Sequence, residues 1–237
     1  MLTKIFKPAT LAAAVLMIGH AQADEASVKQ AVEDFVGAPA VESVQLTQYA
    51  DLYEIVLRSG EVVYTDQNVN FIIDGRIIDT ETRRDVTQAR ITELSAIDFD
   101  ELPFENAFKQ VRGDGSRTFA TFEDPNCGYC KRLGAELSKL DNVTIYTFLY
   151  PVLGEDSDRK SRNIWCADDP AQAWNDWLLN EERPADKDCD TQAVDENLAL
   201  GREMRVQGTP TIFLSDGQRI GGYVPAEQLE QALDNVE

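Results

Sequence analysis

The chain has 237 residues, with 22 lysines and arginines, 42 aspartates and glutamates, four cysteines and one histidine. That length is enough for one large or two small domains with hydrophobic cores, and a hydrophobic content of 43% excludes a chain that is disordered throughout. The formal net charge of −20 disfavours binding to nucleic acid or to an anionic membrane surface, and we interpret the acidity as a solvated, self-repelling surface.

Residues 1–23 have the pattern of a secretory signal peptide. Lys4 and Lys7 give a positive start, an apolar run covers Ala9 to Ile18, and Ala21-Gln22-Ala23 offers small residues for cleavage. This run is too short to span a bilayer and no later run is long enough, so we expect no stable membrane insertion. We place the mature start at Asp24, and loss of the two lysines changes the net charge to −22.

The single histidine, His20, lies within this predicted signal peptide. A mature protein without histidine has no Ser-His-Asp or Cys-His catalysis and no histidine-ligated metal. Covalent chemistry would then depend chiefly on the four cysteines.

The region after the signal predicts a small, mostly β unit of roughly 60 residues, which is thin for an independent core. It would gain from pairing with a second copy, or its apolar strands would pack on the second domain. The predicted elements are a helix over Ala26–Val36, strands over Val41–Leu46, Leu52–Arg58 and Glu61–Thr65, and a hairpin of Phe71–Ile73 with Arg76–Ile78 around Asp74-Gly75.

A polar, helix-favouring segment follows over Thr80–Ile97, with sparse apolar residues and no glycine or proline inside. We interpret it as an exposed connecting helix.

From Arg117 onward the order of elements predicts a parallel strand pair with a right-handed βαβ crossover, a helical stretch, a hairpin and a last helix. Trp165, Trp174 and Trp177 are the expected core residues of the helical stretch. The predicted elements are strands over Thr118–Phe122 and Val143–Leu149, a helix after Cys130, helices within 157–206, a hairpin of Thr211–Leu214 with Gln218–Ile220, and a helix carrying Leu229, Leu233 and Val236.

Cys127-Gly128-Tyr129-Cys130 comes where a strand gives way to a helix. Unpaired backbone N–H groups and the helix dipole stabilise a thiolate at the first cysteine, which makes Cys127 the attacking group. Cys130, one turn further in, is placed to close a disulfide with it. A structural metal site or a plain structural bridge is the alternative, but Cys166 and Cys189 lack the spacing of a second zinc knuckle.

Cys166 and Cys189 favour a bridge that staples the helical insertion, which would contribute ~3 kcal/mol by loop-closure entropy. A second redox pair is the alternative. Gly208-Thr209-Pro210-Thr211 precedes the predicted hairpin, and its proline is either a cis residue in a tight turn beside an incoming chain or a trans proline that begins a strand.

Several motifs together closely resemble the DsbC branch of the DsbC/DsbG family of bacterial periplasmic thiol:disulfide interchange proteins. The likeness is specific over about residues 101–237 and looser over 24–100. Its motifs are Phe122-Glu123-Asp124 before the C-x-x-C, Gly128-Tyr129 within it, Ile164-Trp165-Cys166-Ala167, Cys189-Asp190, Leu198-Ala199-Leu200-Gly201 and Gly208-Thr209-Pro210.

The resemblance implies an α/β (α+β) chain: a small, mostly β dimerisation domain over 24–80, a linker helix over 81–100 and a thioredoxin-like catalytic domain with a helical insertion over 101–237. It implies a homodimer with an open, substrate-binding cleft. By matching position Cys127 is the nucleophile, Cys130 the resolving cysteine, Thr209-Pro210 a cis-proline loop and Cys166–Cys189 a structural bridge. No cofactor or metal is implied.

The leading hypothesis is disulfide isomerisation in the periplasm. The Cys127 thiolate attacks a wrong disulfide in a misfolded secreted protein, and either a substrate thiol or Cys130 then displaces it. A membrane reductase resembling DsbD is implied as the partner that keeps Cys127 reduced. Alternatives are a dithiol oxidase, a DsbG-like reductase of sulfenic acids and a holdase. Thr121 stands where the wider thioredoxin class has a buried acid, so proton transfer would need water or a nearby group such as Glu123.

Overall fold

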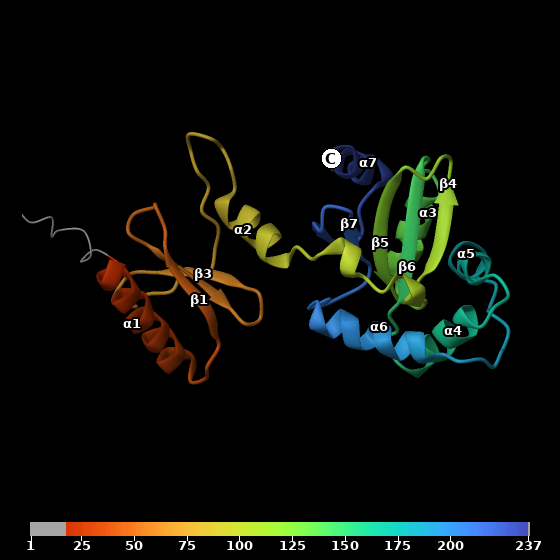
Figure 1. Cartoon of the computed structure of the whole chain (residues 1–237), viewed down its shortest axis with the longest axis horizontal. Coiled ribbons are helices and arrows are strands. Elements are labelled where there is room, and N and C mark those ends of the chain that lie inside the picture. Colours follow the sequence, from red (N-terminus) through yellow and green to blue (C-terminus); the bar gives the residue numbers. More distant parts are fainter. Residues whose placement is uncertain (1–17, 237) are drawn as a thin grey trace, which may run out of the picture. The chain divides into compact units, whose positions relative to one another are not determined.

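The computed structural model describes residues 18–236, which form two compact units, the first ending at Leu94 and the second beginning at Ser95 (Figure 1). Most of the predicted signal peptide, residues 1–17, lies outside the described part. Among the residues that are described, no helix combines the length and the apolar character needed to cross a membrane.

The first unit is a helix packed on a three-stranded antiparallel sheet in the order β1-β2-β3. Val28 and Val32, one helical turn apart, are buried with Tyr53 and Ile55 in its core. Gly37, at φ +78°, ends the helix because glycine takes this left-handed conformation without strain. The elements are α1 (Ile18–Val36), β1 (Val41–Leu46), β2 (Tyr53–Leu57) and β3 (Val62–Thr65). The three strands predicted between Val41 and Thr65 are confirmed.

The hairpin predicted around Asp74-Gly75 is wrong. The predicted strands bond to different partners: Ile73 forms a bridge with Tyr64 of β3, and Ile78 forms one with Asp85. A two-residue turn of the type that Asp-Gly favours needs positive φ, which Asp74 and Gly75 do not have. The apolar side chains of the predicted hairpin are largely exposed, namely Phe71, Ile72, Ile73 and Ile78.

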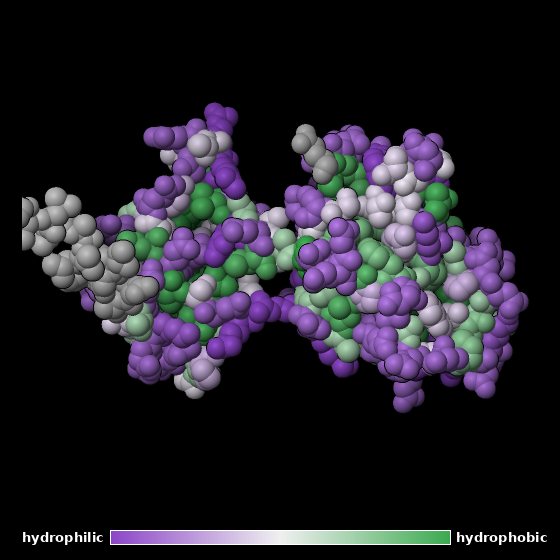
Figure 2. Space-filling view, viewed as in Figure 1, coloured by the Kyte–Doolittle hydropathy of each residue, from purple (hydrophilic) through white to green (hydrophobic). Residues whose placement is uncertain are grey.

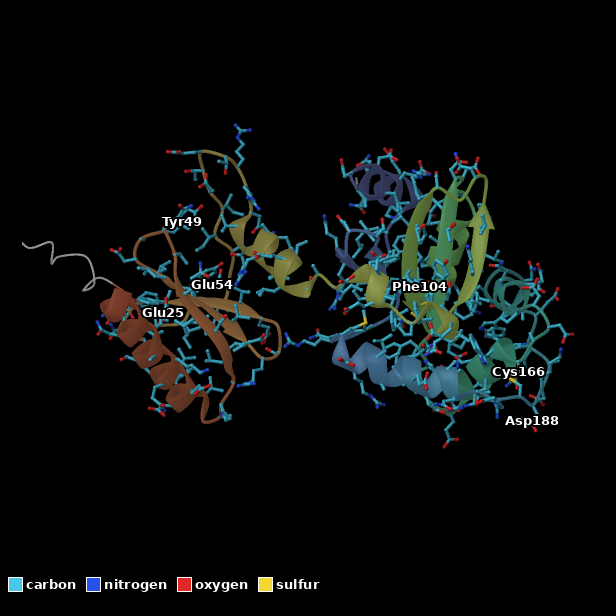
Figure 3. All side chains as sticks on the ribbon, in the orientation of Figure 1. Glu25, Tyr49, Glu54, Phe104, Cys166 and Asp188 are labelled. Atoms are coloured by element: carbon cyan, nitrogen blue, oxygen red, sulfur yellow. A yellow bond between two sulfur atoms is a disulfide. The ribbon has the colours of Figure 1, made fainter. Side chains whose placement is uncertain are left out.

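The connecting helix is shorter than predicted and is not a free-standing element. Helix α2 spans Val86–Ser95, and Arg83 before it has a left-handed backbone at φ +58°. Ile91 and Leu94 pack on the small core of β2 and β3. Arg90 adds an ion pair at 2.9 Å to Glu54, which is labelled on the first unit in Figure 3. The helix therefore covers part of the first sheet.

The second unit is a five-stranded mixed sheet in the order β4-β6-β5-β7-β8, with β5 and β6 parallel and the other pairs antiparallel. Its elements are β4 (Phe108–Arg112), β5 (Arg117–Glu123), α3 (Gly128–Leu137), β6 (Val143–Leu149), α4 (Glu155–Trp165), α5 (Pro170–Asn180), α6 (Gln192–Glu203), β7 (Thr211–Leu214), β8 (Arg219–Gly221) and α7 (Ala226–Asp234), with 3-10 turns at Phe99–Glu101 and Phe104–Asn106. The predicted parallel pair, terminal hairpin and last helix are confirmed.

The two faces of β5 bury different cores because successive strand residues point to opposite sides. Phe119 packs with Leu133 of α3 and Leu229 of α7. Ala120 and Phe122 pack on the other face, in a cluster with Phe148. Glu123, in phase with Phe119, therefore belongs to the face that α3 covers.

Helices α4 and α5 form the helical insertion and bury Trp174 against Phe108, whose ring centroid lies 6.0 Å away. Trp165 and Trp177 are partly buried at the edge of this cluster. Hydrophilic side chains cover much of the surface on the face drawn in Figure 2, in keeping with the acidic composition.

Candidate active site

The C-x-x-C motif lies where β5 gives way to α3. Cys127 is the N-cap of α3, and the backbone N–H of Cys130 donates to its Sγ at 3.4 Å. Both thiols are free; Cys127 is 6% exposed, whereas Cys130 is fully buried. The first sulfur thus lies at the positive end of a helix with some access to solvent, and the second has none.

The environments of the two thiols shift their pKa values in opposite directions. A hydrogen bond from the Cys130 thiol, supported by the Thr209 side chain and by backbone N–H groups, lowers the pKa of Cys127 to about 5 despite burial. Burial, followed by the nearby Cys127 and Glu123, raises the pKa of Cys130 far above its usual range. At neutral pH Cys127 is therefore a thiolate and Cys130 a thiol.

The segment before β7 lies against Cys127 although it is 82 residues away in sequence. The Thr209–Pro210 peptide bond is cis, and Cys127 Sγ, as a thiol, donates to the Thr209 carbonyl oxygen at 3.2 Å. Thr211 Oγ1 donates to the Gly208 carbonyl oxygen at 2.8 Å and secures the turn.

Gly128 and Tyr129 form the exposed start of α3. A Cβ atom on Gly128 would meet no atom within 4 Å, and Tyr129 is 57% exposed. The guanidinium of Arg132 lies 5.8 Å from the Tyr129 ring and 5.8 Å from the Tyr223 ring. The surface beside Cys127 therefore combines open space, aromatic rings and a cation.

Asp124 anchors the loop between β5 and the motif. Its buried carboxylate accepts four hydrogen bonds at 2.7–2.9 Å, two on each oxygen. The donors are the backbone N–H groups of Asn126, Val152 and Leu153 and the hydroxyl of Ser157. The loop that carries Cys127 is thereby tied to the start of α4.

The helical insertion supports the same loop through Trp177 and Lys160. Trp177 Nε1 donates to the Pro125 carbonyl oxygen at 2.5 Å, and Lys160 Nζ donates to Asn126 Oδ1 at 2.6 Å. The Lys160 ammonium also lies 3.9 Å from the centre of the Trp177 ring. The three residues before Cys127, Asp124 to Asn126, therefore each accept a hydrogen bond from a side chain of the insertion.

Glu123 is a buried carboxyl group on the α3 side of β5. The side chain is fully buried, and neither carboxyl oxygen has a partner at hydrogen-bonding distance and angle. Burial raises its pKa to about 8, against the smaller opposing effects of the Thr121 hydroxyl and the Cys130 thiol. A carboxyl group that is part ionised near neutral pH therefore lies beside the two cysteines.

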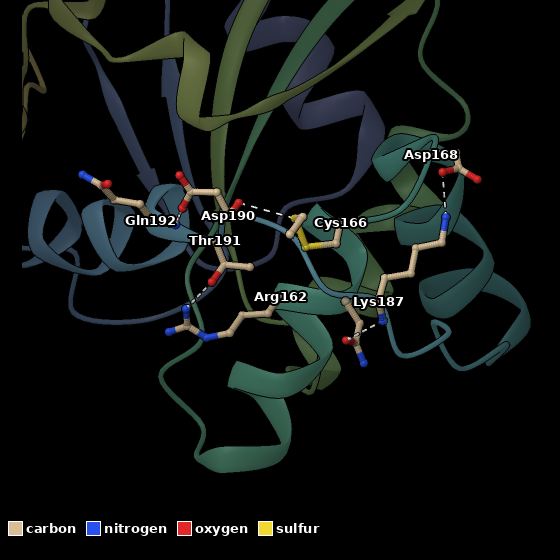
Figure 4. The surroundings of a disulfide bond; sticks show 9 residues. Arg162, Cys166, Asp168, Lys187, Asp190, Thr191 and Gln192 are labelled. Atoms are coloured by element: carbon tan, nitrogen blue, oxygen red, sulfur yellow. Dashed lines mark hydrogen bonds and ion pairs between the residues drawn. A yellow bond between two sulfur atoms is a disulfide. The ribbon is translucent and has the colours of Figure 1, made fainter.

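Cys166 and Cys189 are joined by a disulfide with a Cα–Cα distance of 5.6 Å (Figure 4). Cys166 caps the C-terminus of α4, and Cys189 lies in the segment that leads to α6. Arg162 bonds Thr191 at 2.7 Å across the same junction. The bridge is therefore part of the insertion and is separate from the C-x-x-C motif.

The support given by Asp124, Lys160 and Trp177 is not evident from the sequence. Asp124 belongs to the Phe122-Glu123-Asp124 motif, but its four donors come from residues 2 to 33 positions further along the chain. Lys160 and Trp177 come together only in the folded insertion. No group of three or more potential metal ligands occurs among residues 18–236.

Comparison with known proteins agrees with this geometry. Residues 104–237 match the family described as a thioredoxin-like domain, and residues 19–88 match the disulfide bond isomerase protein N-terminal domain. A crystal structure of a disulfide interchange protein from Neisseria gonorrhoeae superposes with a TM-score of 0.54 and 38% identity, covering 56% of this chain and 96% of that one. Fold and site together define a thioredoxin-like thiol:disulfide oxidoreductase.

The sequence relatives narrow this class. The chain is 50% identical over 193 residues to a probable thiol:disulfide interchange protein DsbC from Bordetella pertussis, over 81% of this chain and 68% of the relative. It is 28% identical over 223 residues to the thiol:disulfide interchange protein DsbC of Escherichia coli, over 91% and 90% of the two chains. The chain belongs to the DsbC family of thiol:disulfide interchange proteins.

Proposed function

We propose that this chain is a periplasmic protein disulfide isomerase and reductase that rearranges wrong disulfides in secreted proteins. The observation that carries the proposal is the asymmetry of the two thiols. Cys127 has a pKa lowered to about 5, and Cys130, fully buried beside it, has a strongly raised pKa. Cys127 is therefore the thiolate that can attack a substrate disulfide, and Cys130 stays protonated until a mixed disulfide has formed.

The reaction begins when the Cys127 thiolate attacks one sulfur of a substrate disulfide. A mixed disulfide forms, and the other substrate sulfur leaves as a thiolate. A different substrate thiolate then attacks the mixed disulfide, which forms a new pairing and regenerates Cys127. Alternatively Cys130 attacks Cys127, which releases a reduced substrate and leaves a Cys127–Cys130 disulfide.

Substrate binding is assigned to the surface beside Cys127. Gly128 and Tyr129 leave room for an unfolded chain, and the Thr209-Pro210 turn lies across from them. Because proline has no N–H, the turn leaves space for a chain to lie alongside. The Cys166–Cys189 bridge is assigned a structural role, since it is separate from this surface.

The organisation of the chain supports a dimer. We assign residues 1–23 to a removed signal peptide, 24–80 to dimerisation, 81–100 to a linker and 101–237 to catalysis. Exposed apolar residues of the first unit, including Phe71 and Ile78, are suited to burial against a second copy. A dimer would hold a non-native chain near two active sites by chaperone-like contacts. This would raise the effective concentration of the active sites around the substrate disulfides. A membrane reductase resembling DsbD would return the Cys127–Cys130 disulfide to its dithiol.

A dithiol oxidase is the second candidate, and the low pKa of Cys127 is the observation that favours it. A stabilised thiolate stabilises the reduced protein, which makes its disulfide a stronger oxidant. The same thiolate would also serve a reductase of sulfenic acids.

Trapping the intermediate tests the proposal. The reduced Cys130→Ser variant is mixed with a scrambled, fully oxidised protein and quenched with acid, and the adducts are mapped by mass spectrometry. We expect a mixed disulfide on Cys127 that persists until a thiol is added. Absence of this adduct from a folded variant would exclude catalysis through Cys127. Rapid oxidation of a reduced substrate, with no effect on the scrambled one, would favour the oxidase.

A further inference from the structure

The step in which Cys130 attacks the mixed disulfide requires a proton acceptor. Cys130 is fully buried, and burial raises its pKa far above neutrality. The thiol cannot ionise into water, so its proton must pass to a group within the protein. In the mixed disulfide Cys127 is itself bonded and cannot take this proton.

Two carboxyl groups lie in the chain directly before the motif, and only one has free acceptor capacity. Asp124 already accepts four hydrogen bonds, two on each oxygen. Glu123 accepts none on either oxygen. Strand periodicity places Glu123 on the face of β5 that α3 covers, and the Cys130 thiol is one of the polar groups that act on its pKa.

We propose that Glu123 accepts the Cys130 proton and thereby sets how fast the mixed disulfide is resolved. This inference rests on the proposed function. The Cys130 S–H proton passes to the Glu123 carboxylate, and the Cys130 sulfur attacks Cys127 Sγ. The Cys127–Cys130 bond forms, the bond from Cys127 to the substrate breaks, and the substrate sulfur leaves with the electron pair as a thiolate that takes a proton from water.

In this mechanism the protonation state of Glu123 decides whether a bound substrate is rearranged or reduced. With Glu123 protonated, Cys130 stays a thiol and the mixed disulfide survives long enough for a substrate thiol to rearrange it. With Glu123 ionised, Cys130 resolves the intermediate and the substrate leaves reduced. The titratable groups that act on Glu123 are the Cys127 and Cys130 thiols.

The test uses oxidised glutathione, a disulfide that can be reduced but not rearranged. Reduced full-length protein is mixed with it and quenched with acid at intervals, and mass spectrometry separates the Cys127–glutathione adduct from the Cys127–Cys130 disulfide. For Glu123→Gln we expect adduct formation to change by less than about threefold and resolution to slow by about 100-fold or more. Glu155→Gln, which removes an exposed carboxylate from α4, is the matched control and should resolve at the wild-type rate.

The pH profile separates this role from a structural one. In the wild type, the rate at which Cys130 resolves the Cys127–glutathione adduct should increase as pH rises through neutrality. In Glu123→Gln the adduct should still form, but this increase should be absent. The amide is isosteric and uncharged, so it removes a buried charge without removing volume. Resolution at the wild-type rate in folded Glu123→Gln would overturn the proposal and leave the Cys127 chemistry intact. Failure of the wild-type protein to form either the adduct or the Cys127–Cys130 disulfide would instead overturn the proposed function and this inference with it.

Discussion

The reactivity of Cys127 depends on the sulfur three residues further along the chain. The Cys130 thiol is the strongest of the groups that lower the pKa of Cys127, ahead of Thr209 and the backbone N–H groups of the first helical turn. The position of Cys127 at the start of α3 therefore does not by itself explain its low pKa.

Two substitutions at Cys130 separate its hydrogen bond from its bulk. Cys130→Ala removes the donor, so the pKa of Cys127 should rise from about 5 by about one to two pH units, whereas Cys130→Ser keeps a donor and should leave it nearly unchanged. Thiolate absorbance at 240 nm against pH measures both. Equal values in the two variants would mean that the helix terminus dominates.

Glu123 and Cys127 should give opposite pH dependences of stability. The pKa of Glu123 rises from 4.5 to about 8 on folding, so between these values the folded state binds more protons and stability falls as pH rises. The pKa of Cys127 falls from 9.0 to about 5, so its contribution to stability rises with pH over that range.

Reduced Cys127→Ser should therefore reveal the contribution of Glu123. We expect its free energy of unfolding to fall between pH 5 and pH 8 by on the order of a few kcal/mol, and a second change, Glu123→Gln, to remove most of this slope. Urea denaturation at several pH values measures it. A flat profile in the single variant would show that folding leaves the pKa of Glu123 close to its unfolded value.

The chemistry of the motif could be predicted from the sequence, and most of its support could not. A C-x-x-C at a helix start is a local pattern, so Cys127 and Cys130 were identifiable. The partner carbonyl of Thr209 is 82 residues away, and only the resemblance to a family pointed to it. The orphaned carboxyl of Glu123 depends on strand phase and on helix coverage, which no local pattern reports.

At the scale of elements, the loop before the motif is held by the insertion rather than by its own turn. Asp124→Asn would place an amide NH₂ opposite backbone donors, so we expect a loss of about 2–4 kcal/mol in the free energy of unfolding. Ser157→Ala removes one donor from the same carboxylate and should cost about 1 kcal/mol.

Guanidinium denaturation of the oxidised variants measures both losses. Equal losses for Asp124→Asn and Ser157→Ala would contradict the central place of Asp124. In that case the contacts of Pro125 and Asn126 with Trp177 and Lys160 would be the main support of the loop.

Elements with strong patterns were predictable, and those shaped by tertiary contacts were not. Strand β6 is a continuous apolar run and begins and ends as predicted. Strand β4 was missed because it lies at the sheet edge, with Lys109, Val111 and Arg112 at least partly exposed along a short run. The hairpin prediction at Asp74-Gly75 failed because Ile73 pairs with β3 instead of with its neighbour.

At the scale of the whole molecule, dimerisation through the first unit remains a prediction. Ile78→Glu adds a charge to an exposed apolar residue of that unit, so a chain starting at Asp24 should shift from dimer to monomer at micromolar concentration. Val111→Glu makes the same change at an exposed position of the second unit and should remain dimeric. Sedimentation velocity measures both. A monomeric parent chain would contradict the proposed dimer.

A thiolate at Cys127 that rearranges wrong disulfides should restore native pairing in a scrambled protein. The most direct measurement is recovery of native activity from a scrambled, fully oxidised multi-disulfide substrate, with protein starting at Asp24 in a mild glutathione buffer. We predict recovery well above the buffer alone, lost in Cys127→Ser and largely retained in Glu123→Gln. Recovery that is no better than buffer with the parent protein, or unchanged in Cys127→Ser, would contradict the account.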